Sequence, residues 1–139
     1  MSIKILFVEQ DASVRSALLK AVSEKYSAVA VSTAEEALER LTQEAFDVVV
    51  FEINLPGMSG LDLLQHCPRL RPGIITIAMA AQATVEMAVE TMKRGATEFL
   101  IKPFPPEELL SVLQVAEERV QRHALLPVGT GSGMAAVEL

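Results

Sequence analysis

Three ionisable side chains of this sequence are suited to joint chemistry if the fold gathers them. Each directly follows a short apolar run: Glu9 after residues 3–8, Glu52 after residues 47–51, and Lys102 after residues 99–101. Two carboxylates and one ammonium within reach of one another form ion pairs or hold a weak cation. Gln10, next to Glu9, and Ala80, after the run at 74–79, would border the same place.

The hydrophobic pattern predicts the elements that position these residues. Short apolar runs rich in β-branched and aromatic residues favour buried strands. Such runs occupy residues 3–8, 28–31, 47–51, 74–79 and 99–101. Apolar residues at helical spacing lie between these runs and after the last one. The sequence therefore predicts five strands that alternate with five helices.

Capping and helix-breaking residues mark where these helices begin and end. The expected boundary residues are Asp11 or Ser13 and Thr33 with Glu36 at helix starts, Gly60 and Pro68 at the two ends of the third helix, Gly95 after the fourth, and Pro105 or Pro106 at the start of the fifth. In the fourth helix, Val85, Ala88, Val89 and Met92 form an apolar stripe that is expected to face the core.

Strict alternation of strands and helices is typical of the α/β class. It predicts a doubly wound, flavodoxin-like, five-stranded parallel sheet with five helices covering both faces. In such folds the working site lies beyond the carboxyl ends of the strands, near the switch in strand order. The order 2-1-3-4-5 would bring Glu9, Glu52 and Lys102 to one shallow pocket.

Composition bounds the class of protein. The chain has 139 residues, half of them apolar, which is the size of one domain with a proper core. The net charge of -6 argues against direct nucleic-acid binding, which needs clustered basic residues. The apolar runs are too short to span a membrane, and Cys67 is the only cysteine. We expect a cytoplasmic protein without disulfides or membrane contact.

Two motifs, together with the alternation, resemble bacterial two-component receiver domains. They are LPGMSG at residues 55–60 and AVETMKRGATEFLIKPF at residues 88–104. The likeness covers about residues 3–122, and the segment 85–104 is most similar to receivers of NtrC-type transcription regulators. The resemblance implies a role in two-component phosphorelay signalling.

The resemblance also assigns a position to each candidate site residue. By this likeness Glu52 stands at the phosphoacceptor position, Glu9 and Gln10 at the acidic pair, Ala80 at the hydroxyl position, Phe99 at the aromatic switch position, Lys102 at the lysine position, and Pro103 after it as a candidate cis proline.

Three of these positions depart from the family pattern. Receivers ordinarily have an aspartate that accepts the phosphoryl group, and Glu52 is longer by one methylene, which displaces the carboxylate by about 1 Å. Gln10 is neutral where an acid is usual, and Ala80 has no hydroxyl. A Mg²⁺ site made by Glu9, Glu52 and the carbonyl of Asn54 would be weak and could remain unoccupied, so no cofactor is expected.

These departures favour a pseudo-receiver that acts by protein contacts and is not an enzyme. An ion pair between Glu52 and Lys102 would then hold one conformation. Two alternatives stay open: a receiver that still binds Mg²⁺ and accepts phosphoryl groups weakly, and a regulatory fragment of a sigma54-type transcription regulator.

The expected partners are proteins: a histidine kinase, an output domain or another regulator. By the resemblance, a homodimer or an output contact would use the face of the fourth helix, fifth strand and fifth helix. Met87 and Thr91 lie off the predicted inward stripe, and Arg119 lies outward on the last helix, so we assign these three to the interaction face.

Other candidate chemistry is sparse. His66 and His123 are far apart in sequence and lack acidic or cysteine companions, which disfavours a zinc site or a catalytic triad. The segment GTGSG follows no predicted strand and lacks the lysine of a phosphate-binding loop. We therefore expect a receiver domain over residues 1–123 and a flexible tail or linker over residues 124–139.

Overall fold

A computed structural model describes residues 2–124, and the predicted tail falls almost entirely outside them. Five strands and five helices alternate along the chain, as predicted. Their bounds are β1 Lys4–Val8, α1 Ala12–Val22, β2 Ser27–Val31, α2 Ala34–Gln43, β3 Val48–Glu52, α3 Gly60–Leu70, β4 Ile75–Ala80, α4 Val85–Lys93, β5 Glu98–Ile101 and α5 Pro106–Ala124.

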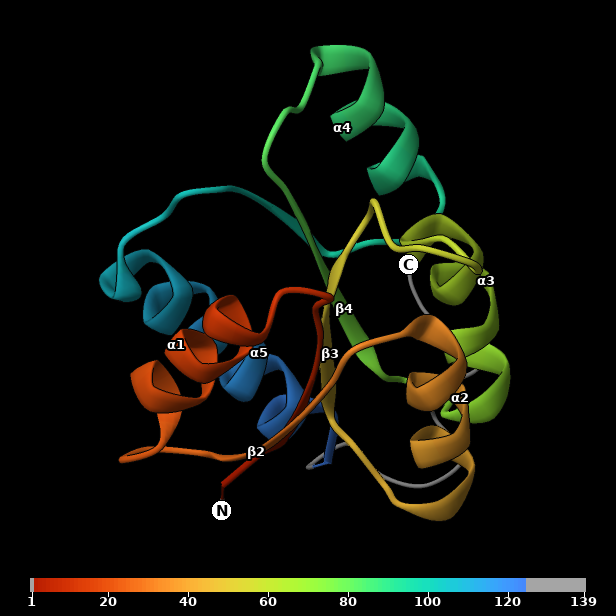
Figure 1. The fold of residues 1–139 in the computed structure, drawn as a ribbon. Coiled ribbons are helices and arrows are strands. Elements are labelled where there is room, and N and C mark those ends of the chain that lie inside the picture. Colours follow the sequence, from red (N-terminus) through yellow and green to blue (C-terminus); the bar gives the residue numbers. More distant parts are fainter. Residues whose placement is uncertain (1, 125–139) are drawn as a thin grey trace, which may run out of the picture.

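The strands form one parallel sheet in the order β2-β1-β3-β4-β5, which confirms the predicted topology. Figure 1 shows α1 and α5 together on one side of the sheet and α2 and α3 on the other. Each face therefore has its own buried core, with Phe7, Leu18 and Leu113 in the first and Phe51 and Leu64 in the second. The central strand β3 is buried along its whole length, as a strand covered on both faces should be.

Local capping explains where the helices begin. The carboxylate of Asp11 accepts hydrogen bonds from the backbone N–H groups of Ser13 and Val14, and the Thr33 hydroxyl accepts one from Glu36. Ser59 forms a reciprocal capping box with Asp62 at the start of α3. Of the two caps proposed for the first helix, Asp11 is the one observed.

A close backbone approach explains the glycine at the start of α3. A β-carbon built on Gly60 would lie 2.3 Å from the carbonyl oxygen of Glu52 and 2.7 Å from the α-carbon of Ile53. Real side chains do not tolerate such distances, so only glycine lets α3 begin this close to the end of β3. The turn therefore holds α3 directly against the strand that carries Glu52.

The prediction that α3 ends at Pro68 was wrong, because the helix continues to Leu70 with Pro68 inside it. Proline removes its own N–H donor and crowds the preceding turn, but it need not end a helix whose other contacts are strong. Here Leu64 and Cys67 on either side of that turn are buried in the core. The backbone N–H of Arg71 closes the last turn on the carbonyl of Cys67.

The predicted inward face of α4 was also wrong. Val85 is 77% exposed, Val89 and Met92 are exposed as well, and the fully buried residue is Thr91. Both sets recur at helical spacing, so periodicity alone could not choose between them. Burying Thr91 is tolerated because its hydroxyl donates to the carbonyl of Met87 at 2.7 Å.

This phasing of α4 corrects the predicted interaction face. Thr91 cannot contact a partner because it is buried, and Met87 is half-buried against the core. Arg119 is exposed on α5, so its assignment stays a prediction.

Candidate functional site

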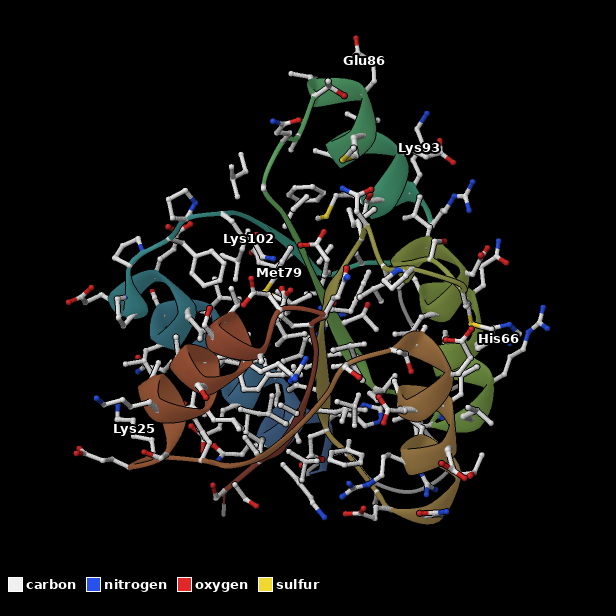
Figure 2. The ribbon with its side chains drawn as sticks, in the orientation of Figure 1. Lys25, His66, Met79, Glu86, Lys93 and Lys102 are labelled. Atoms are coloured by element: carbon white, nitrogen blue, oxygen red, sulfur yellow. The ribbon has the colours of Figure 1, made fainter. Side chains whose placement is uncertain are left out.

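The candidate site lies at the carboxyl end of the sheet, where three strands deliver ionisable residues. Glu9 follows β1 directly, Glu52 is the last residue of β3, and Lys102 follows β5. The backbone N–H of Lys102 donates to the carbonyl of Ala80 at 2.9 Å, which fixes the start of its side chain. Figure 2 shows Lys102 at this end of the sheet.

The three side chains form one ion cluster, as the predicted strand order required. The ammonium of Lys102 donates to Oε1 of Glu52 at 2.5 Å and also to Oε1 of Glu9. Only 4% of the Glu9 side chain, 8% of the Glu52 side chain and 18% of the Lys102 side chain is exposed. The cluster is thus buried, and its two carboxylates share one ammonium.

Backbone donors satisfy the second oxygen of each carboxylate. Oε2 of Glu9 accepts from the N–H of Asp11 at 3.0 Å, and Oε2 of Glu52 accepts from the N–H of Asn54 at 2.9 Å. All four carboxylate oxygens therefore have an N–H partner. These bonds fix the orientation of both carboxylates.

Burial and hydrogen bonding act in opposite directions on Lys102. Desolvation by itself would lower the pKa of the ammonium, but hydrogen bonds to Glu52 and Glu9, and their negative charges, outweigh it. The pKa of Lys102 is therefore raised above its ordinary value of 10.5, and the ammonium is charged at neutral pH.

Arg15 supplies a second cation near the cluster, which sequence reasoning missed. Its Nη1 donates to the carbonyl oxygens of Glu9 at 2.8 Å and Gln10 at 2.7 Å. The only sequence signal is that Arg15 lies one helical turn after the cap Asp11. Contacts with backbone carbonyls leave no pattern in side-chain type, so such a residue is found only in the folded chain.

Glu35 is a second residue that the sequence did not reveal. This residue of α2 accepts a hydrogen bond from the N–H of Met58 at 3.1 Å, in the turn that follows β3. Gly57 in the same turn has a φ of +73°, a conformation that favours glycine. Glu35 and Gly57 together determine the course of the loop that leaves the site.

A hollow of about 650 Å³ opens at the cluster. Its lining residues are Glu9, Gln10, Asp11, Ala12, Ser13, Val14, Glu52, Asn54, Ala81 and Lys102. Three carboxylates thus face one ammonium, and the hollow is negatively charged. Gln10 is exposed at its rim.

The residues assigned to switch positions lie nearby. Ala80 ends β4 and is fully buried, and it is Ala81 that lines the hollow. Phe99 is half-buried and packs against the core on the α2 and α3 side of the sheet. The bond between Lys102 and Pro103 is cis, as the resemblance had implied.

The donor set does not fit Mg²⁺. Among residues 2–124, no group of three or more histidine, cysteine, aspartate or glutamate side chains is placed to hold a metal ion. Glu9 and Glu52 also have their oxygens engaged by Lys102 and by backbone N–H groups. Mg²⁺ needs near-octahedral oxygen ligands at about 2.0–2.1 Å, which this arrangement does not offer.

The remaining candidate residues lie apart from the cluster. Figure 2 shows His66 on α3, and His123 belongs to the last turn of α5. Cys67 is buried in the core, and desolvation raises the pKa of its thiol to about 12, which makes it unreactive. No helix within residues 2–124 has both the length and the apolar character needed to cross a membrane.

Comparison with known proteins agrees with this architecture. The family model described as the response regulator receiver domain matches residues 5–114. The chain belongs to this family. Receiver domains are modules of two-component signalling, as the sequence motifs had indicated.

Curated relatives place this receiver domain near transcription regulators. The response regulator protein FleR of Pseudomonas aeruginosa is 38% identical over 99% of the chain, and the DNA-binding transcriptional regulator NtrC of Azospirillum brasilense is 32% identical over 91%. The chain spans only 28% of FleR and 27% of NtrC.

Solved structures support the same fold. A CheY-like receiver domain protein from Methanospirillum hungatei superposes with a TM-score of 0.80 and 29% identity, covering 88% of this chain and 99% of that one. NtrX from Brucella abortus, in a complex with ADP, gives a TM-score of 0.82 and 28% identity, covering 94% of this chain and 31% of that one.

Proposed function

We propose that this receiver domain signals by protein contacts and without phosphorylation of residue 52, and that it is not an enzyme. The observation that carries the proposal is the ammonium of Lys102, which hydrogen-bonds to both Glu52 and Glu9 in a buried cluster. The carboxylate at the phosphoacceptor position is thereby already paired. A standing ion pair holds this end of the sheet in one arrangement.

The electrostatics of the hollow support the same proposal. A phosphoryl donor is an anion, and it would approach a hollow whose lining has three carboxylates, Glu9, Asp11 and Glu52, against one ammonium, that of Lys102. Phosphoryl transfer relies on cations to neutralise the transferring oxygens, and the donor set does not suit Mg²⁺. Ala80 offers no hydroxyl to a product. We therefore also propose that the domain works without a cofactor.

The partner face is the second part of the proposal. Among the described residues, the large hydrophobic side chains that remain exposed all lie on α4, β5 and α5: Val85, Val89, Met92, Ile101 and Val115. Figure 1 shows α4 projecting beyond the rest of the fold. The restriction of these exposed apolar residues to three elements supports a contact surface there. We assign this face to a histidine kinase, an output domain, another regulator or a second copy of the chain.

The relatives support a role for this domain within a longer transcription regulator. FleR and NtrC are much longer than the chain, and NtrC is described as a DNA-binding transcriptional regulator. We propose that the domain regulates a sigma54-type transcription regulator, with any DNA contacts made outside residues 2–124. The activity of such an output region, measured with this domain fused to it and with the domain removed, would test this regulation directly.

Intact mass spectrometry tests the phosphorylation part of the proposal. The protein is incubated with acetyl phosphate and Mg²⁺, beside the Glu52→Gln variant and a receiver that carries the usual aspartate. We expect a phosphoadduct on the aspartate receiver alone. A stoichiometric adduct on this protein that Glu52→Gln abolishes would show instead that it still accepts phosphoryl groups.

A further inference from the structure

The ion cluster solves an electrostatic problem that the fold itself creates. Parallel strands β1 and β3 are neighbours, so their carboxyl ends bring Glu9 and Glu52 close together in a buried place. Two carboxylates in a region of low dielectric constant repel each other. A cation placed between them offsets this repulsion.

Lys102 provides this cation from within the chain. Its ammonium donates to one oxygen of each carboxylate. A divalent ion that bridged the same two oxygens would bind at about 2.0–2.6 Å from each, and so would occupy nearly the position of Nζ. The Lys102 ammonium and a divalent ion cannot both occupy that position, because their atoms would overlap and their positive charges would repel.

Four further oxygen atoms around the cluster are also engaged. Oε2 of Glu9 and Oε2 of Glu52 accept backbone N–H groups, and the carbonyl oxygens of Glu9 and Gln10 accept from Arg15. A free ion would have to displace Lys102, which β5 already holds in place through its N–H bond to Ala80. Lys102 loses little freedom by binding, whereas a dissolved ion loses its translational freedom and its hydration shell.

We propose that the Lys102 ammonium is the resident cation of this pocket and keeps divalent cations off Glu9 and Glu52. The inference deepens the proposed function and rests on it in one respect, since both treat the ion cluster as a permanent feature. It adds that the domain is insensitive to Mg²⁺ and Mn²⁺, and that this insensitivity depends on one side chain.

Thermal unfolding with and without millimolar MgCl₂ or MnCl₂, at constant ionic strength, tests this inference. The proteins compared are the wild type, Lys102→Met, which removes the cation, and Lys102→Arg, which keeps it. We expect the midpoints of the wild type and Lys102→Arg to be unaffected by either salt. The midpoint of Lys102→Met should rise with salt concentration, and adding Glu52→Gln to that variant should remove the rise.

Two results would overturn the inference. One is a Lys102→Met midpoint that responds to divalent salts no more than the wild type. The other does not depend on the folding of Lys102→Met: it is stoichiometric Mn²⁺ binding to the wild type by calorimetry, lost in Glu52→Gln. Because neither readout involves phosphate, a wild type that binds Mn²⁺ but forms no phosphoadduct would refute this inference and leave the proposed function standing.

Discussion

The ammonium of Lys102 lies 2.5 Å from Oε1 of Glu52, across 50 positions of sequence. This contact joins the end of β5 to the end of β3, with β4 between them in the sheet. The same ammonium also holds Glu9 at the end of β1. One lysine thus links the ends of β1, β3 and β5 at the end of the sheet where the candidate site lies.

The cluster is expected to respond unequally to the loss of its members. Lys102→Met leaves two buried carboxylates without a cation, and removing one partner of a buried pair typically costs about 3–5 kcal/mol. Glu52→Gln leaves Glu9 and Lys102 as a neutral pair, so its cost should be that of one impaired hydrogen bond, about 1–3 kcal/mol. Urea unfolding at neutral pH measures both free energies.

Glu9→Gln is the matched control for this comparison. It removes the other carboxylate and should resemble Glu52→Gln, because each acid binds Lys102 and one backbone N–H group. If Glu52→Gln destabilised the protein as much as Lys102→Met, the two carboxylates would not be sharing one cation.

The cap Asp11 gives a prediction in acid. Hydrogen bonds from the Ser13 side chain and from the backbone of Val14 and Ser13 lower the pKa of Asp11 below its ordinary value of 3.8. A carboxyl group whose pKa is lower in the folded state contributes stability above its unfolded pKa, and this contribution is lost as the pH falls through the folded pKa. Near neutral pH, the free energy of unfolding of the wild type should therefore exceed that of the Asp11→Ala variant.

Urea titrations of the wild type and Asp11→Ala from pH 6 down to the acid limit would show this difference shrinking below pH 3.8. Asp11→Asn is the control: asparagine keeps a capping oxygen, so its loss near neutral pH should be smaller than that of Asp11→Ala, and it should shrink over the same pH range because neither variant titrates at this position. A difference between wild type and Asp11→Ala that stays constant with pH would mean that the charge of Asp11 does not contribute.

Much of this fold could be predicted because local and global signals agree. The five apolar runs, the caps Asp11 and Thr33 and the alternation of elements all indicate one α/β topology, which determines which strand ends meet. The meeting of Glu9, Glu52 and Lys102 follows from strand order alone. Their burial does not, because burial depends on how closely α1 and the loops pack around the strand ends.

The two predictions that were wrong, the end of α3 and the inward face of α4, have a common physical cause. Pro68 and the face of α4 were judged from local rules, and tertiary packing overrode both. Arg15 and Glu35 act on backbone carbonyl and N–H groups, which every residue possesses, so side-chain type carries no trace of the contact. The orientation of α4, with Thr91 inward and Val89 outward, is the departure from prediction with the most bearing on function.

The orientation of α4 gives the last prediction. Val89 lies on the exposed side of α4 with Val85 and Met92, so Val89→Glu should change the free energy of unfolding by no more than about 0.5 kcal/mol. Thr91→Glu would bury a charge without a partner and should cost more than about 2 kcal/mol, although it differs by only two positions. Because Val89→Glu is expected to leave the fold unaltered, it can also test the contact face.

Sedimentation of the wild type and of Val89→Glu over a range of concentrations measures self-association. If the wild type self-associates through α4, β5 and α5, Val89→Glu should make it more monomeric, whereas Glu24→Gln, an exposed control between α1 and β2, should leave it unaffected. Val89→Glu unfolding as readily as Thr91→Glu would place Val89 in the core and remove the basis for this face.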